Sequence, residues 1–305
     1  MTGEEHMKNS RFFFLVFYLC FHSAFTVVAQ DMMPLVPSVN VLPNSPVTLR
    51  PYTFEPDTIC FMVELPKALP KTEENILLDE KKALDPIFEK FRLARLNAVR
   101  DSIRIVHIGD SHVRGRIFPN TVGEKLAETF GPIKYEDMGV NGATCLTFTH
   151  PARIEAIIEA HPDVLILSFG TNESHNRRYS SAVHYNQIDE LVKMIRTSLP
   201  EVSIILTTPP GSYESFKQRN RKRTYSINPR TSIAVDIIKR YAAEHNLAVW
   251  DMYNLVGGKK SACTNWKAAG LLRPDHVHYL PEGYVLHGEL LSEAIINSYN
   301  RYVSH

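Results

Sequence analysis

Short apolar runs alternate with longer amphipathic runs through the second two-thirds of the chain. The apolar runs predict buried strands at 102–108, around Tyr135, at 164–167, at 202–206 and around Val249. Apolar positions three and four residues apart predict helices near 119–130, 151–160, 182–198 and 231–245, and after Pro281. Strands that alternate with helices predict a three-layer α/β/α sandwich around a five-stranded parallel sheet.

Two segments of different character precede the first predicted strand. From Asp31 to about Phe61 the chain is rich in proline and lacks helical periodicity, which predicts an extended segment or a tether. From Glu73 to Arg100 apolar residues recur at helical spacing, which predicts one or two amphipathic helices. We therefore divide this part into an extension at 30–72 and a domain with a leading helix at 73–305.

The first 29 residues have the pattern of a secretory signal peptide. A basic stretch precedes an apolar run at Phe12–Phe21, and small residues up to Ala29 offer a cleavage site before Gln30. A membrane anchor is the alternative, but the run is shorter than the ~20 residues that span a bilayer, and His22 interrupts it. We expect a secreted or periplasmic protein with no stable membrane insertion after cleavage.

Composition narrows the classes of partner and cofactor. A chain of 305 residues with 44% hydrophobic residues can bury one sizeable core. The formal net charge of +1 gives no reason to expect nucleic acid or an anionic membrane as a partner. After cleavage three cysteines would be left, Cys60, Cys145 and Cys263, without the spacing of a zinc site. We expect no disulfide framework, metal or other cofactor, and Cys145 should pack as a small hydrophobe.

A Gly-Asp-Ser triplet at the end of the first strand is the first candidate for chemistry. Gly109 lets the chain turn sharply, so that Asp110 and Ser111 stand where the strand yields to a helix. A serine there can present its hydroxyl above the sheet, with backbone N–H groups facing a developing negative charge. Asp and Ser are also common in ordinary turns and at helix N-caps, so the triplet by itself is a weak signal.

Three further segments carry the partners that a nucleophilic serine needs: a base, a carboxylate that orients it, and donors for an oxyanion. Asp275 and His278 are three residues apart, so one short turn can place both side chains on the same side of a loop. Gly142 follows the second strand, where its N–H can approach a substrate with no Cβ in the way. Asn172 follows the third strand and offers its side-chain amide.

These four segments, in this order, resemble those of the SGNH/GDSL esterases and lipases over roughly residues 102–298. The resemblance implies the flavodoxin-like SGNH hydrolase fold, with Ser111 as nucleophile and Asp275 and His278 completing a catalytic triad. It also implies an oxyanion hole made by the N–H groups of Ser111 and Gly142 and by Asn172. One departure is His112, where many members carry an apolar residue.

A narrower resemblance concerns the substrate. The runs Gly170–Glu173 and Trp266–Tyr284 look more like the bacterial branch that removes O-acetyl groups from peptidoglycan and other glycans. This implies an acetylated glycan, or another small ester, as the partner, with Asp110, Glu173 and Trp266 as candidate substrate contacts. A lipase, a thioesterase or an O-acetyltransferase of the same fold stays open, as does a glycan-binding protein without turnover.

Other features have a structural as well as a functional interpretation. The segment 209–230 is basic and aromatic, and forms either a lip over a sugar or an anionic glycan, or a solvated charged loop. His276 and His278 could hold a metal, although the nearby Asp and the upstream Ser favour the triad. Glu173 either orients its loop or caps it. His107 lies within a strand and is expected to be a hydrogen-bonded core histidine.

Overall fold

A six-stranded sheet forms the centre of the described structure, in the order β1-β8-β5-β4-β2-β3. Its strands are β1 (Leu77–Leu78), β2 (Ile103–Gly109), β3 (Ile133–Gly139), β4 (Val164–Ser168), β5 (Ser203–Thr207) and β8 (Ala248–Trp250). The last five are parallel to one another, and β1 pairs antiparallel with β8. The five predicted parallel strands are confirmed, and the sheet has one more strand than predicted.

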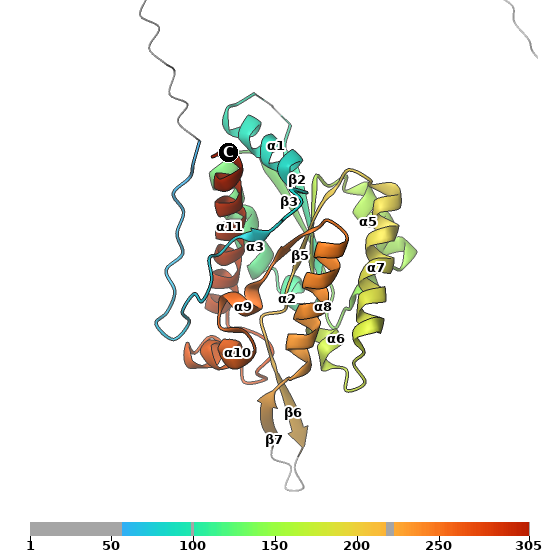
Figure 1. Ribbon diagram of the computed structural model, residues 1–305, viewed down its shortest axis with the longest axis vertical. Coiled ribbons are helices and arrows are strands. Elements are labelled where there is room, and N and C mark those ends of the chain that lie inside the picture. Colours follow the sequence, from blue (N-terminus) through green and yellow to red (C-terminus); the bar gives the residue numbers. More distant parts are fainter. Residues whose placement is uncertain (1–56, 99–100, 218–222, 305) are drawn as a thin grey trace, which may run out of the picture. The chain divides into compact units, whose positions relative to one another are not determined.

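This computed structural model describes residues 57–98, 101–217 and 223–304, all within the unit Phe54–His305 (Figure 1). The predicted signal peptide at 1–29 lies outside the described residues, as does the 30–56 part of the predicted extension. Within the described ranges, no helix combines the length and the apolar character needed to cross a bilayer.

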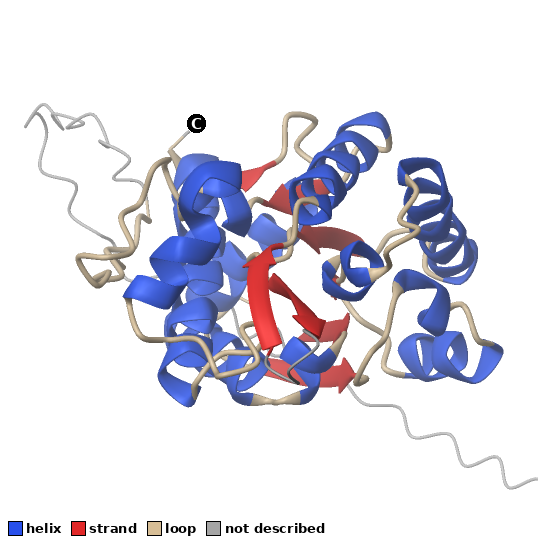
Figure 2. Ribbon diagram, turned by 90° about the horizontal axis from the view of Figure 1, so that it is seen from below, coloured by secondary structure: helices blue, strands red, loops and turns tan. Residues whose placement is uncertain are grey.

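Helices cover both faces of the sheet, and Figure 2 shows the strands between them. The first face carries α1 (Asp85–Arg95), α3 (Ile117–Phe130) and α11 (Pro281–Val303), and the second α5 (Pro151–Glu159), α7 (Ser181–Ser198) and α8 (Arg230–Glu244). Successive strand residues point to opposite faces. Ile105 accordingly belongs to the first hydrophobic core and Val106 to the second. The expected α/β/α layering is therefore confirmed.

Local sequence signals begin several of these helices. Proline occupies a first-turn position of α5 and of α11, where its missing N–H has no helical acceptor to lose. Ser180 caps α7 by accepting a hydrogen bond from the N–H of Val183. The five helices predicted after residue 110 correspond to α3, α5, α7, α8 and α11.

Three segments fold differently from their prediction. The 73–100 segment contains one helix, α1, whereas Leu77 and Leu78 form the edge strand β1. The 209–230 segment contains an antiparallel hairpin, β6 (Tyr213–Lys217) and β7 (Arg223–Ile227), rather than only a loop. Two helices that were not predicted, α9 (Met252–Leu255) and α10 (Gly258–Ala268), follow β8. Such short or polar elements depend on their partners in the fold more than on their own periodicity.

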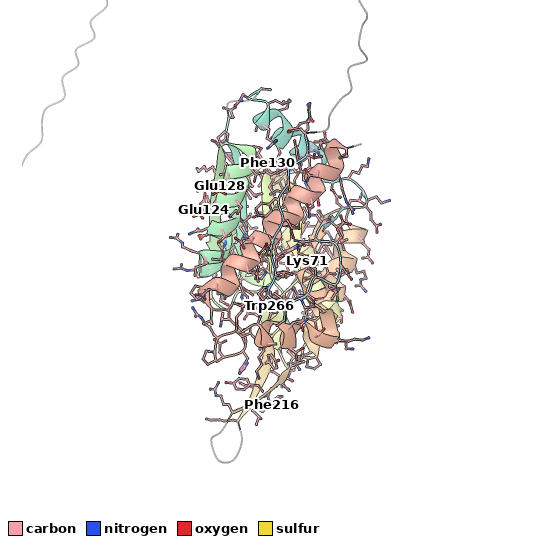
Figure 3. The ribbon with its side chains drawn as sticks, turned by 90° about the vertical axis from the view of Figure 1, so that its left-hand side faces the viewer. Lys71, Glu124, Glu128, Phe130, Phe216 and Trp266 are labelled. Atoms are coloured by element: carbon pink, nitrogen blue, oxygen red, sulfur yellow. The ribbon has the colours of Figure 1, made fainter. Side chains whose placement is uncertain are left out.

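The segment that precedes β1 runs along α11. Ile59 and Asn300 exchange two hydrogen bonds of 2.8 Å, one from the backbone N–H and one to the carbonyl of Ile59. Buried Glu293 accepts the N–H of Val63 at 2.7 Å and forms an ion pair with Lys71, which Figure 3 shows beside the helix. The described residues 57–72 of the extension are thus held on the domain.

The strand order places a reversal point beside β2. Parallel strands β3 and β4 lie on either side of β2, with Gly109 in register with Gly139 and with Ser168. Sheets of this kind bind ligands outside the carboxyl ends of their strands, at the point where the strand order reverses. The segments after β2, β3 and β4 therefore meet at one place.

Candidate functional site

Ser111 is the first residue of a short helix, α2 (Ser111–Arg114), which directly follows β2. Asp110 caps this helix, since its Oδ1 accepts the N–H of His112 at 2.9 Å. Within the described residues, the N–H groups of Ser111 and Gly142 donate no hydrogen bond to another protein group. A donor at the start of a helix that has no protein acceptor is available to an anion.

Two glycines allow α2 to lie against the strand ends. A Cβ on Gly139 would be 2.1 Å from the backbone nitrogen of Arg114, and one on Gly109 would be 2.5 Å from Val113. Either contact is too short to exist, so a larger residue would push α2 away from the sheet. The turn that positions Ser111 therefore depends on both glycines.

His278 lies between Ser111 and Asp275. Its Nε2 is 2.9 Å from the Ser111 Oγ, and its Nδ1 is 3.0 Å from Oδ2 of Asp275. The other carboxylate oxygen of Asp275 accepts the N–H groups of Val277 and His278. An Nδ1–H that donates to the carboxylate leaves Nε2 free to accept the Ser111 proton. The structure thus brings together the serine, the histidine and the carboxylate that the sequence motifs suggested.

The hydrogen bonds around Asp275 keep its carboxylate ionised. Burial opposes ionisation, but the N–H groups of His278 and Val277 and the His278 ring outweigh it and lower the pKa of Asp275. A negative charge next to Nδ1 stabilises an imidazolium ring, because opposite charges attract in a partly desolvated site. The pair is therefore suited to hold a proton on His278 temporarily.

The Gly142 and Asn172 segments come together at the same edge of the sheet. Asn172 donates from its Nδ2 to the carbonyl of Ala143 at 2.9 Å and, more weakly, to Oδ2 of Asp110 at 3.3 Å. Gly142 has a left-handed backbone (φ 75°) and open space around the position of a Cβ. The amide of Asn172 is thus fixed between the residue that follows Gly142 and the residue that precedes Ser111.

Glu173 is a carboxylate that holds two loops. Its Oε1 accepts the N–H of Cys145 and its Oε2 the N–H of Gly170, both at 2.9 Å. The side chain is buried, which raises its pKa. Of the two alternatives left by the sequence, orienting a loop or capping it, the carboxylate does both.

The three candidate substrate contacts are buried, which corrects that prediction. Asp110 and Glu173 are 1% and 6% exposed and bind backbone N–H groups, so neither presents a surface to a ligand. Trp266 is fully buried in α10 and packs edge-on against Tyr279, with ring centroids 4.7 Å apart. Nearness in sequence to the Asp275 loop had suggested an exposed Trp266, but the amphipathic helix turns it into the core.

A second histidine, His112, lies behind His278. Their ring centroids are 5.5 Å apart, and His112 Nδ1 is 3.1 Å from the hydroxyl of Tyr284. Burial lowers the pKa of His112 to about 3, so its ring is neutral near pH 7. The sequence identified this residue only as a departure from the family pattern, and the tertiary structure places it against the candidate base.

Histidines elsewhere are structural. His107 is fully buried, with its ring nitrogens 2.8 Å from the hydroxyl of Tyr135 and 2.7 Å from that of Ser168. The expectation of a hydrogen-bonded core histidine is confirmed. Both ring nitrogens of His278 have partners, which leaves the His276–His278 pair no free lone pair on His278 for a metal.

Cys145, Glu173 and His184 form the cluster of metal-ligating side chains found among the described residues. Their ligand atoms lie within 4.8 Å of one another, and all three residues are buried. The adjoining cavity has a volume of about 10 Å³, which is the size of one water molecule. Both oxygens of Glu173 already accept backbone N–H groups, so this cluster fits a packed core better than a metal centre. Burial of Cys145 agrees with its predicted packing role.

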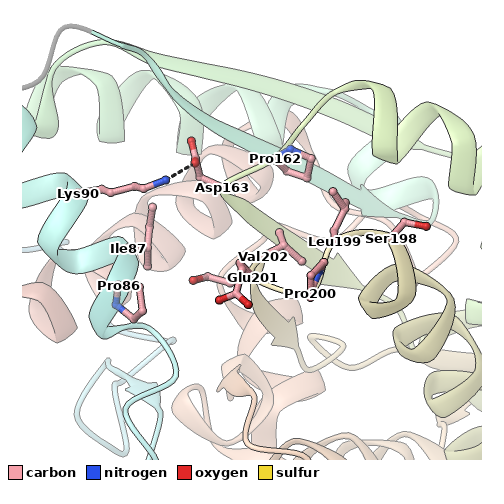
Figure 4. A pocket seen from close by; sticks show the side chains of 11 residues that line it. Pro86, Ile87, Lys90, Pro162, Asp163, Ser198, Leu199, Pro200, Glu201 and Val202 are labelled. Carbon is pink, nitrogen blue, oxygen red and sulfur yellow. Dashed lines mark hydrogen bonds and ion pairs between the residues drawn. The ribbon is translucent and has the colours of Figure 1, made fainter.

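A larger cavity lies elsewhere, at the amino ends of β4 and β5 (Figure 4). It has a volume of about 240 Å³, and Lys90 and Asp163 pair at its rim. Since parallel strands bind ligands at their carboxyl ends, this cavity is on the wrong side of the sheet for the Ser111 site.

Comparisons with known proteins agree with this geometry. The model of the GDSL-like Lipase/Acylhydrolase family matches residues 107–286. No curated protein sequence matches the chain.

Solved structures share the fold. A peptidoglycan O-acetylesterase aligns with a TM-score of 0.65 at 17% identity, over 75% of this chain and 99% of that chain. A GDSL-like lipase from Bacteroides thetaiotaomicron (20% identity, TM-score 0.47) covers 69% of this chain and 98% of its own. The lipase/acylhydrolase from Enterococcus faecalis (25% identity, TM-score 0.47) covers 64% and 96%. On the family match, which spans more than half of its length, the chain belongs to the GDSL-like lipase/acylhydrolase family of ester hydrolases.

Proposed function

We propose that this protein is a secreted serine esterase that removes O-acetyl groups from a carbohydrate. The observation that carries the proposal is the chain of contacts from Asp275 through His278 to Ser111, with hydrogen-bond distances of 3.0 and 2.9 Å. A hydrogen-bonded base on a serine is what activates its hydroxyl as a nucleophile. A binding protein would not need this arrangement.

The first half of the reaction forms an acyl-enzyme. His278 takes the proton of Ser111 as the Oγ attacks the ester carbonyl, and Asp275 stabilises the imidazolium. The tetrahedral oxyanion is held by the N–H groups of Ser111 and Gly142 and by the amide of Asn172. Collapse expels the alcohol, which takes the proton from His278, and leaves an acetylated Ser111.

The second half restores the enzyme. His278 removes a proton from a water molecule, which attacks the acyl carbonyl, and the same donors hold the second oxyanion. Ser111 leaves with the proton from His278, and acetate is released. A sugar hydroxyl in place of the water would give acetyl transfer by the same residues.

The surroundings of Ser111 support a polar alcohol portion and a small acyl group. Exposed residues on the segments after β2, β3 and β4 are mostly polar or charged, among them Arg114, Arg116, Asn141, Asn176 and Arg177. Leu146 is the large exposed hydrophobic residue of these segments within the described ranges. A lipase needs an extended apolar surface for a long acyl chain. This composition favours a carbohydrate ester instead.

Location and domain organisation belong to the same proposal. A signal peptide at 1–29 would send the protein out of the cytoplasm, where acetylated wall or matrix glycans occur. The 30–72 extension would then be the mature amino terminus, and its described part is bound along α11.

Acyl-chain selectivity tests the proposal. We expect kcat/KM on p-nitrophenyl esters to fall steeply from acetate to octanoate, and Ser111→Ala to lower it by about 10³-fold or more with an unchanged thermal transition. A fluorophosphonate should label the native protein and not Ser111→Ala. A preference for octanoate would favour a lipase, and full activity of Ser111→Ala would exclude the triad. Acetate release from a panel of acetylated glycans then identifies the carbohydrate.

A further inference from the structure

We propose that the β6–β7 hairpin is a binding arm for an anionic polysaccharide, one whose chain carries carboxylate groups. This inference rests on the proposed function, because it names the class of carbohydrate that would bear the ester. The hairpin projects beyond the end of the sheet at which Ser111 lies (Figure 1). The elements that contact it are the ones that carry the site.

The arm is joined to the loop that contains Asp275 and His278. The N–H of Tyr213 donates to the carbonyl of His276 at 3.0 Å. The rings of Tyr213 and Tyr225 lie 5.3 and 4.3 Å from the His276 ring, measured between centroids. His276 has a left-handed backbone, with φ 58°, which a residue other than glycine adopts only when its surroundings hold it. The hairpin and the loop are therefore one structural unit.

The base of the arm is joined to the segment after Asn172. Ser212 Oγ is 2.8 Å from Nε2 of His175 in α6 (Thr171–His175), and Arg230 pairs with Glu214. Arg230 also donates to the carbonyl of Ser174 at 2.7 Å. A polymer bound on the arm would thus lie beside both the base and the proposed oxyanion donor.

The outer part of the arm concentrates positive charge. Lys217 and Arg223 are directly opposite each other in the antiparallel register, an arrangement that destabilises a hairpin. From 215 to 235 the sequence contains six basic residues and no acidic one. The one acid of β6, Glu214, is already paired with Arg230. A local excess of like charge that costs stability is explained if an anionic ligand neutralises it.

Aromatic rings accompany these charges. Phe216, labelled at the arm in Figure 3, is 39% exposed, and the guanidinium of Arg177 lies 5.6 Å from its ring centroid. Lys267 of α10 lies at the same distance from Tyr213. Sugar rings have apolar faces that pack on aromatic side chains, while arginine binds carboxylates with two parallel hydrogen bonds. Rings and guanidinium groups side by side suit a carboxylated sugar chain better than a neutral one.

A pair of matched substrates and a pair of matched variants test the arm. The substrates are O-acetylated polygalacturonate and the same polymer with its carboxyl groups reduced to alcohols. The variants are Lys217→Gln/Arg223→Gln in the arm and Lys134→Gln/Arg301→Gln, which removes two exposed charges from other elements. We expect the arm variant to raise KM at least about tenfold on the carboxylated polymer and not on the reduced one. Hydrolysis of p-nitrophenyl acetate should stay within about twofold for both variants.

Binding without turnover separates this inference from the proposed function. Ser111→Ala protein should be retarded in a gel that contains polygalacturonate, and the added arm substitutions should abolish the retardation. Loss of retardation in high salt is expected, because exposed charges are screened. Equal retardation with and without the arm substitutions overturns the arm, even if esters are hydrolysed. Retardation that depends on the arm supports it, even if no acetate is released. Stronger, arm-dependent retardation by duplex DNA would overturn it in favour of nucleic acid.

Discussion

The Glu173 carboxylate accepts the N–H of Cys145 at 2.9 Å across 28 residues of sequence. Its other oxygen accepts the N–H of Gly170, so one side chain joins the segment after β3 to the segment after β4. Gly142 and Asn172, the two proposed oxyanion donors outside α2, belong to these two segments. Their separation is therefore set by a residue that we do not expect to touch the substrate.

Replacing Glu173 by Ala should lower both stability and activity. Two buried N–H groups would lose their acceptor, at about 1–3 kcal/mol each. Glu173→Gln keeps one acceptor oxygen and should be less destabilising in a urea titration. Glu190→Ala, which removes an exposed carboxylate from α7, is the control and should change stability by less than about 0.5 kcal/mol. Equal stability of Glu173→Ala and the control would show that the two loops hold their positions without the carboxylate.

Asn172→Ala should reduce kcat by about 10²-fold or more with little change in KM. An oxyanion donor acts chiefly in the transition state, after charge has moved onto the carbonyl oxygen. Steady-state kinetics on p-nitrophenyl acetate give both constants, with Asn186→Ala on α7 as the control. A rise in KM alone would mean that Asn172 contacts the substrate in its ground state.

His278→Ala should reduce kcat as severely as Ser111→Ala, by about 10³-fold or more. Asp275→Ala should keep at least roughly tenfold more activity than His278→Ala, because the base would still be present although less well oriented. Single-turnover measurements with p-nitrophenyl acetate compare the three variants directly. Activity of Asp275→Ala at or below that of His278→Ala would indicate a larger role for the carboxylate than orientation and charge stabilisation.

Asp110 should make the protein less stable as the pH rises from about 4 to about 7. Burial raises the pKa of Asp110 from 3.8 to about 7 in the folded protein. Between these values the unfolded chain ionises while the folded protein keeps its proton, so unfolding becomes easier by up to about 4 kcal/mol. Below about pH 4 both states are protonated, and above about pH 7 both are ionised.

The measurement is the difference in unfolding free energy between the native protein and Asp110→Asn, from urea titrations across that range. Taking the difference removes the contribution of carboxylates with lowered pKa, such as Asp57 and Asp275, which act in the opposite direction at lower pH. A difference that does not change with pH would mean that Asp110 ionises in the folded protein as it does in the unfolded chain.

Local sequence was sufficient for the parts of this protein that local interactions determine. The strand before Ser111 is a continuous apolar run because both of its faces are buried. Asp275 and His278 are three residues apart, so a single turn joins their side chains. Gly109 announces a close approach of backbone to backbone, although only the fold identifies Gly139 as its counterpart at the end of β3.

Tertiary structure decided which distant side chains meet and which face of an element is exposed. The contact between Ser111 and His278 spans 167 residues, and β1 exists only because β8 offers it an edge. Trp266 looks like a site residue in the sequence, yet α10 buries it, and the polar 209–230 segment gains its hairpin from cross-strand pairing. Periodicity records how much of an element is buried. It does not record the partner that buries it, because that partner comes from another part of the chain.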